Sequence, residues 1–206
     1  MAPTGAGVLA IVGWFAVVGQ YFATDVEGFA GTVNYFSYFT ILSNILVAAT
    51  LTAAALAPDS RGGRFLLRPP VAMATMVYIT VTALTYYVML ASLYRLEGWA
   101  RHFDHILHYA MPPAFLLFWL VAVPKGGLRF GAIVWVLVPP FVYGAWTLLH
   151  GALSGFWPYP FVDAAKIGYL DFFRNVAIFG VFFAVVATFY ILIDRLLGRH
   201  GWSRSA

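Results

Sequence analysis

The sequence predicts an all-α membrane protein, a bundle of six transmembrane helices. Of its 206 residues, 62% are hydrophobic and only 10% are charged, and the mean hydropathy is +0.83. A soluble domain carries about 25% charged residues. The apolar runs are each about 20 residues long, the length that crosses a bilayer as a helix. They do not alternate as the strands of a membrane barrel do. Only helices and closed barrels satisfy backbone polar groups in lipid, so a helical bundle is expected.

The six apolar segments use most of the chain and leave no room for a soluble domain. The first has no Lys or Arg before it and is long for the apolar core of a signal peptide, so we expect it to remain as a span. The second carries Asn, Ser and Thr at helical spacing, and the third places Thr and Tyr in its second half. The last three are polar in one half and almost purely apolar in the other. We expect spans at residues 5–23, 34–56, 70–93, 103–121, 130–150 and 172–193, in a single domain of residues 1–206.

The distribution of Lys and Arg predicts that both termini are cytoplasmic. With six spans, the two termini and the loops after the second and fourth spans share one side. That side has eight basic residues against four on the other, and positive loops face the cytoplasm. The eight are Arg61, Arg64, Arg68, Lys125, Arg129, Arg195, Arg199 and Arg204; the four are Arg95, Arg101, Lys166 and Arg174. Since the basic residues lie at span ends, the net charge of +4 does not indicate nucleic-acid binding.

Polar side chains gather at one predicted depth in the outward half of the bundle. Counted along ideal helices, Thr40 lies about 9 Å inside its span and His108 about 7.5 Å. The third, fifth and sixth spans place their polar groups toward the same side. Ionisable groups are costly in lipid and usually mark function, so we expect an outward-opening pocket. The long loop before the last span is rich in aromatic residues, including Tyr159, and is expected to lie at headgroup level.

The residue types fit acyl transfer. Asp104 and His108 are four residues apart on one helical face, so the carboxylate can orient the imidazole as a general base. Cysteine is absent, so the nucleophile would be Thr, Ser or water. Thr40 matches His108 in depth, while Ser37 lies one turn nearer the water and stays open as an alternative. The supporting candidates are His105 and Asn44, and the candidates for binding an oxyanion or a headgroup are Tyr86, His150, Arg174 and Asn175.

Three other interpretations use the same residues. His108 and His150 could ligate a haem. His105, His108, His150 and Asp171 could hold zinc, although no zinc signature is present. A lipid-binding protein or transporter could use the same pocket without turnover, although no internal repeat of the kind many transporters show is evident.

The blocks NYFSYFTILSNILVA and DHILHYAMPPAFLLFWL resemble the androgen-induced and androgen-dependent TFPI-regulating protein family, including its bacterial six-span relatives. The resemblance implies a membrane threonine hydrolase that cleaves long-chain esters, such as fatty acid esters of hydroxy fatty acids. It implies Thr40 as nucleophile, His108 as base and His105 as its companion. It also implies no metal or haem, a lipid substrate from the bilayer, and a multi-pass protein of the bacterial plasma membrane.

Overall fold

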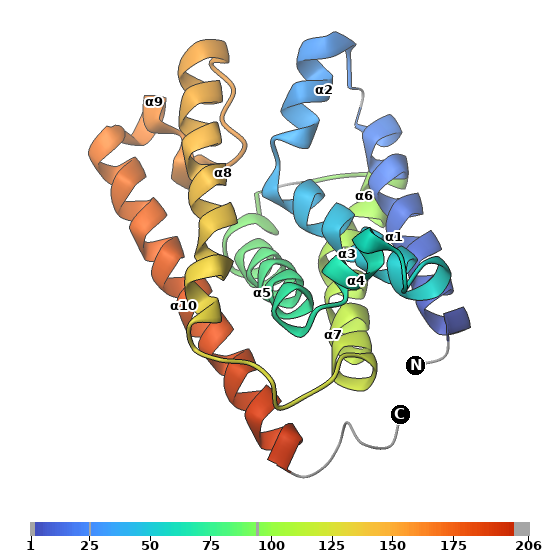
Figure 1. Ribbon diagram of the computed structural model, residues 1–206. Helices are drawn as coiled ribbons and strands as arrows, with labels where there is room; N and C mark the ends of the chain where they lie inside the picture. Colours follow the sequence, from blue (N-terminus) through green and yellow to red (C-terminus); the bar gives the residue numbers. More distant parts are fainter. Residues whose placement is uncertain (1–2, 25, 94, 200–206) are drawn as a thin grey trace.

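The computed structural model describes residues 3–24, 26–93 and 95–199, and within these ranges it contains helices and no strand (Figure 1). Six helices are long and apolar enough to cross a membrane, which confirms the predicted fold class. They are Pro3–Ala23, Phe39–Leu56, Pro69–Leu90, Gly98–Ala122, Ala132–Ser154 and Tyr169–Arg199. Arg204, one of the residues counted for orientation, lies outside the described residues.

Two of the six spanning helices contain a π-helical turn. Shorter helices and a 3₁₀ turn lie in the segments between the spans. The elements are α1 (Pro3–Ala23), α2 (Gly28–Phe36), α3 (Phe39–Leu56), α4 (Arg61–Leu66), α5 (Pro69–Thr85) with the π-helical turn Tyr86–Leu90, α6 (Gly98–His105) with the π-helical turn Ile106–Ala110, α7 (Met111–Ala122), α8 (Ala132–Ser154), the 3₁₀ turn Pro160–Val162, α9 (Ala164–Ile167) and α10 (Tyr169–Arg199). In Figure 1, α1 begins and α10 ends at the same end of the bundle, as an even number of crossings requires. Which side of the membrane that end faces stays a prediction.

The predicted second span, residues 34–56, is wrong as a single helix. It divides into α2 and α3, with Tyr38 between them in an extended conformation (φ −82°, ψ 126°). Hydrogen bonds from other elements replace those of a continuous helix. The Tyr143 hydroxyl donates to the Ser37 carbonyl (2.9 Å), and the Thr40 N–H donates to the Tyr159 hydroxyl (3.1 Å). The depth counted along an unbroken helix therefore does not describe where Thr40 lies.

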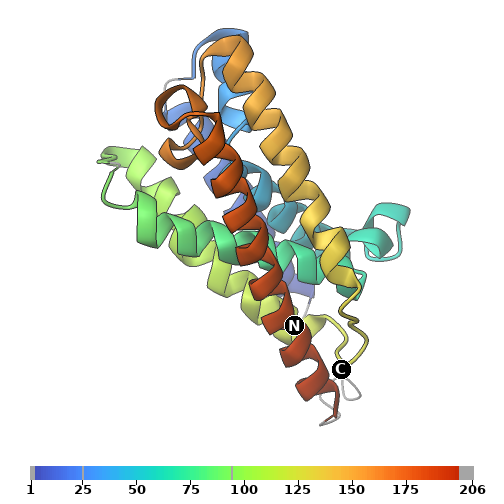
Figure 2. The same ribbon diagram turned by 90° about the vertical axis from the view of Figure 1, so that its left-hand side faces the viewer.

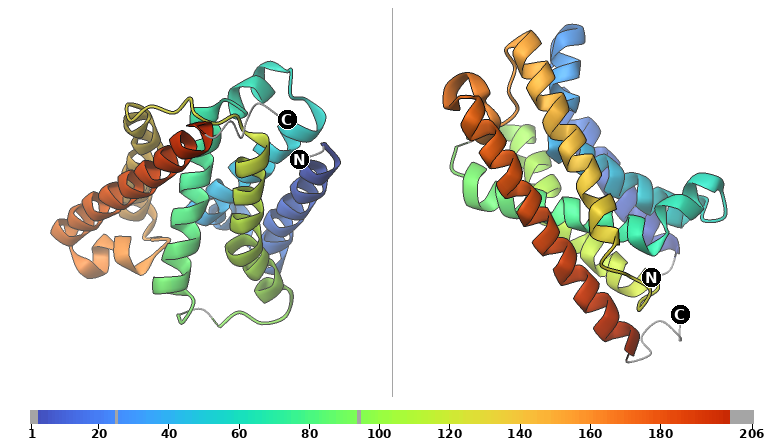
Figure 3. Two further views of the ribbon diagram at one scale, coloured as in Figure 1. Left: turned by 90° about the horizontal axis from the view of Figure 1, so that it is seen from below. Right: turned by 60° about the vertical axis from the view of Figure 1, so that its left-hand side comes forward.

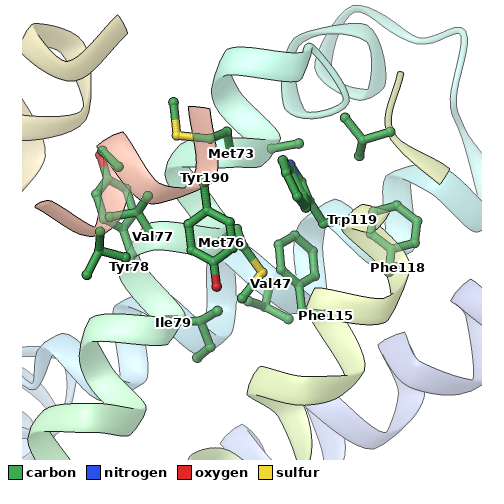
Figure 4. Close-up of a cluster of buried hydrophobic side chains, with 14 of the residues drawn as sticks. Val47, Met73, Met76, Val77, Tyr78, Ile79, Phe115, Phe118, Trp119 and Tyr190 are labelled. Atoms are coloured by element: carbon green, nitrogen blue, oxygen red, sulfur yellow. The ribbon is translucent and has the colours of Figure 1, made fainter. Parts of the chain in front are cut away.

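The core lies where α3, α5, α7 and α10 meet, with α5 in contact with the other three. Figure 4 shows its aromatic and sulfur-containing side chains interlocking. They include Met73, Met76, Phe115, Phe118, Trp119 and Tyr190. Figures 2 and 3 show α8 and α10 running side by side along one flank of this core.

Small residues bring α1 close to its neighbours. A Cβ on Gly13 would lie 3.2 Å from the Cβ of Ala48 in α3, and one on Gly19 would lie 2.3 Å from the ring of Phe103 in α6. Close approach at small residues is the usual means of packing helices in lipid, where hydrophobic burial between helices provides no driving force. The contact fixes α6, and with it Asp104 and the π-helical turn that follows, against α1 and α3.

Candidate active site

Thr40 lies in the first turn of α3, directly after the break that separates α2 from α3. Its side chain is buried, and its hydroxyl Oγ1 lies 3.3 Å from Nε2 of His108. The break lets α3 begin inside the protein, so the hydroxyl is held on the first turn of a helix rather than in the middle of one. The contact between Thr40 Oγ1 and His108 Nε2 joins the candidate nucleophile to the candidate base, which the sequence spacing alone could not show.

His108 is buried in the π-helical turn that follows α6, and its other ring nitrogen faces Asp104. Nδ1 lies 3.0 Å from the Asp104 carboxylate oxygen Oδ1 and also 3.0 Å from the Asp104 carbonyl oxygen. Two acceptors at Nδ1 favour the tautomer with the proton on that nitrogen, which leaves Nε2 to accept from Thr40. The three side chains thus form the hydroxyl–imidazole–carboxylate sequence of an activated nucleophile.

Tyr86 contacts both Asp104 and His108. Its hydroxyl donates to Oδ2 of Asp104, so both carboxylate oxygens are engaged. Its ring stacks on the imidazole of His108, with centroids 3.6 Å apart and planes inclined by 17°. Tyr86 and His108 each lie in a π-helical turn, a feature often found at functional sites. The sequence placed Tyr86 among the candidates for binding an oxyanion or a headgroup, and the structure places it in contact with Asp104 and His108.

Tyr159 is a site residue that sequence analysis missed. It was expected at headgroup level, but the segment between α8 and α10 folds inward and buries it. Its hydroxyl accepts from the Thr40 N–H and lies 3.3 Å from Thr40 Oγ1. Loop residues have no helical periodicity, so no signal in the sequence placed this side chain beside Thr40.

Asn44 and Ser37 are both buried, but they do different work from Thr40. The Asn44 amide donates to the carbonyls of Thr40 (2.9 Å) and Leu107 (3.3 Å), so it ties α3 to the turn that carries His108. The Ser37 hydroxyl donates to the Val33 carbonyl and accepts from the indole of Trp146. Of the two candidate nucleophiles, Thr40 is the one in contact with His108.

The remaining predicted residues do not reach Thr40. His105 is exposed and touches the Tyr109 ring; its expected place beside His108 is wrong because the π-helical turn changes the rotation between them. Arg174 pairs with Asp171 at the surface (3.0 Å). Asn175 donates to the Phe161 carbonyl (2.8 Å), which anchors the loop that carries Tyr159.

His150 lies near the cavity in front of His108 but does not line it. Its Nε2 lies 2.9 Å from Oδ1 of Asn34, and its ring stacks on Trp146. Asn34 lines the cavity in front of His108, so His150 lies behind that wall. Among residues 3–24, 26–93 and 95–199, no group of three or more His, Cys, Asp or Glu side chains gathers in a way that could hold a metal ion.

The hydroxyl, imidazole and carboxylate open into a cavity of about 330 Å³. Its walls come from α1, α2, the start of α3, and the turns that carry Tyr86 and His108. The lining combines polar and apolar side chains, and its polar groups make the cavity suitable for water and for a polar group. The polar lining includes Gln20, Thr24, Glu27, Asn34, Tyr38 and Tyr159.

No family model matches the chain, and no curated protein or solved structure matches it either.

Proposed function

We propose that the protein is an intramembrane hydrolase of long-chain acyl esters with Thr40 as its nucleophile. The observation that carries the proposal is the continuous contact from Thr40 Oγ1 through both nitrogens of His108 to Asp104, in a cavity inside an apolar bundle. The resemblance of the two sequence blocks to membrane threonine hydrolases supports the same assignment. It also supports a bilayer lipid as substrate and the bacterial plasma membrane as location.

In this proposal the reaction has two steps. Thr40 Oγ1 attacks the ester carbonyl carbon while its proton passes to His108 Nε2. The carbon–oxygen bond to the alcohol then breaks, and His108 returns the proton to the leaving alcohol. A water molecule next gives a proton to His108 and attacks the acyl-Thr40 carbonyl, which releases the fatty acid and restores the Thr40 hydroxyl.

The neighbouring residues have supporting roles in this proposal. Asp104 stabilises the imidazolium that forms when His108 takes the proton. The Tyr159 hydroxyl, 3.3 Å from Oγ1, is assigned as a donor to the oxyanion. Under the predicted orientation the cavity faces the outer side of the membrane, from which water for the second step enters.

Covalent labelling tests the proposal directly. Purified protein in detergent is treated with a long-chain fluorophosphonate, and the modified residue is identified by mass spectrometry. Wild type is expected to be labelled on Thr40, and Thr40→Ala and His108→Ala are expected to lose nearly all labelling, because such groups act as a unit. The matched control is Thr50→Ala: Thr50 is also buried on α3, but its hydroxyl bonds the Leu46 carbonyl (2.8 Å). Unlabelled wild type that is correctly folded, and that hydrolyses no ester, would instead favour a protein that binds lipid without turnover.

A further inference from the structure

A second cavity, of opposite character, lies on the far side of Thr40. It has a volume of about 80 Å³ and lies between α3, α5, α8 and α10. Its walls are mainly aromatic and aliphatic, with Val81, Phe141, Val176, Phe179 and Phe183 among them. A group the size of water needs about 10–15 Å³ of such space, so the cavity is narrow but holds a chain of several methylene groups.

The two cavities share only three described wall residues: Thr40, Leu90 and Tyr159. The reactive hydroxyl therefore stands at the boundary between a polar chamber and an apolar one. His108, Asp104 and Tyr86 line the polar chamber and not the apolar chamber. A substrate whose carbonyl is at Thr40 Oγ1 can extend one part into each chamber.

The apolar chamber shares a wall with a groove on the outer side of the bundle. Phe141, Gly144, Val176 and Gly180 line both this chamber and an outer groove along the seam of α8 and α10. A Cβ on Gly180 would lie 2.9 Å from the far end of the Phe141 ring, so the two helices are closely packed at this point. The right panel of Figure 3 shows α8 and α10 side by side along this seam.

We propose, on the basis of the hydrolase function above, that the apolar chamber holds the acyl chain and that the polar chamber holds the alcohol part and the water. The leaving alcohol must receive its proton from His108, and His108 faces only the polar chamber. The acyl chain then occupies the opposite side of Thr40. A polar alcohol is also costly to place among aromatic and aliphatic walls, whereas a hydrocarbon chain is not.

One side chain of the polar chamber is a candidate contact for the alcohol part. Gln20 is 8% exposed, and its Oε1 has no hydrogen-bond partner among the described residues. A buried carbonyl oxygen without a partner is unfavourable. This oxygen has almost no surface open to the chamber, so the Gln20 side chain must turn before it can accept from a ligand. We test whether the alcohol part of the substrate carries a further hydroxyl or amino group that donates to Gln20.

Variants that fill the apolar chamber test where the acyl chain binds, separately from whether the protein is a hydrolase. Gly144→Leu would place its first side-chain atom in ordinary contact with Val176 (3.6 Å) and the rest in the chamber. Leucine also favours a helix interior more than glycine does. Turnover of p-nitrophenyl palmitate is expected to fall about tenfold or more relative to that of the butyrate. Acetyl esters of short and long alcohols are expected to keep their wild-type ratio. Ala152→Leu, on the exposed face of the same helix, is the control and should change neither ratio.

A second pair of variants guards against a folding defect. Val176→Phe fills the same chamber from α10, and Val185→Phe places the same ring on the lipid-facing side of that helix. Folding is checked by labelling with a short-chain fluorophosphonate, which should remain at the wild-type rate. An equal loss for all acyl lengths, or a change that follows the length of the alcohol, would overturn the assignment of the chambers while leaving the hydrolase standing. Absence of turnover and of labelling in wild type would instead remove the hydrolase itself.

The Gln20 assignment has its own measurement. Gln20→Leu is expected to lower turnover of monoacylglycerol severalfold relative to the methyl ester of the same fatty acid, with the acyl-length profile unchanged. If both esters lose equal activity, Gln20 supports the fold and does not select the alcohol.

Discussion

At the scale of single residues, the base is held from several directions, and this arrangement predicts graded losses. Asp104→Asn keeps a similar shape but replaces an acceptor of the Nδ1 proton with an amide that can donate, which favours the wrong tautomer of His108. The rate of fluorophosphonate labelling is expected to fall by about 10³–10⁴. Tyr86→Phe keeps the ring stacked 3.6 Å from the imidazole and removes only the hydroxyl bond to Asp104, so a loss of about tenfold is expected. Equal losses in the two variants, measured as labelling rates at one pH, would contradict the separate roles.

The residues found from sequence are those whose chemistry and helical spacing agree. Asp104 and His108 are four apart in one segment, and that segment still joins them although it turns π-helical between them. Thr40 was predicted because its depth, counted along an unbroken helix, matched that of His108, and because the resemblance implied it. The break before α3 shows that the depth count was not a valid reason. Tyr159 and the position of His105 were not predictable in this way. The first depends on how a loop folds back, and the second depends on a turn whose rotation differs from that of an α-helix.

At the scale of elements, the break between α2 and α3 positions Thr40, the proposed nucleophile, and this arrangement predicts an effect of Tyr143. Tyr143→Phe removes the donor to the Ser37 carbonyl (2.9 Å) at the break. Tyr78→Phe removes an equivalent bond to the Val136 carbonyl (2.9 Å), away from Thr40. Each variant is expected to lose about 0.5–1.5 kcal/mol of stability, seen as a similar drop in Tm. Only Tyr143→Phe should slow labelling of Thr40, by severalfold. Equal labelling rates in the two variants would mean that the break is held without Tyr143.

The spans themselves were predictable because length and apolar composition determine them. Each predicted range overlaps a helix of the structure, and the ends differ by a few residues. The division of the second span was not predictable, since no proline or glycine marks it between Asn34 and Thr40. Its cause is the set of hydrogen bonds from α8 and from the loop before α10, which a local reading of the sequence does not include.

At the scale of the whole molecule, the proposed catalytic residues gather at one end of the bundle, and a loop that links two helices closes the other end. The end with the proposed catalytic residues consists of the start of α3 and the two π-helical turns. At the other end, the loop after α7 closes against α10: Asp194 accepts from the Leu128 N–H (2.9 Å), and a Cβ on Gly198 would lie 2.4 Å from the Cα of Gly126. Under the predicted orientation this closure faces the cytoplasm. It links α7 to α10 and so holds the outer helix pair, α8 and α10, against the rest of the bundle.

This closure contains a buried cation, and its titration should be visible in the stability of the whole molecule. Lys125 is 8% exposed and donates to the carbonyls of Trp119 and Val123. Burial lowers the pKa of Lys125 from 10.5 to about 8, against the opposing effect of Asp194. Between those two values the unfolded chain binds more protons than the folded one, so stability rises with pH across that window. The gain is expected to be about 1–3 kcal/mol, and below pH 8 it is absent because both states are protonated.

The measurement is the Tm of purified protein in detergent from pH 7 to 10.5, compared between wild type and Lys125→Met. Other groups also titrate in this range, so the informative quantity is the difference in Tm between the two proteins. Wild type is expected to gain on Lys125→Met as the pH rises from 8 to 10.5. Lys166→Met is the matched control, because Lys166 has a side chain that is 81% exposed and pairs with Asp163 at the surface. Its difference from wild type should stay flat. A flat difference for Lys125→Met as well would show that Lys125 keeps an ordinary pKa in the folded protein, and that water reaches the closure between α7 and α10.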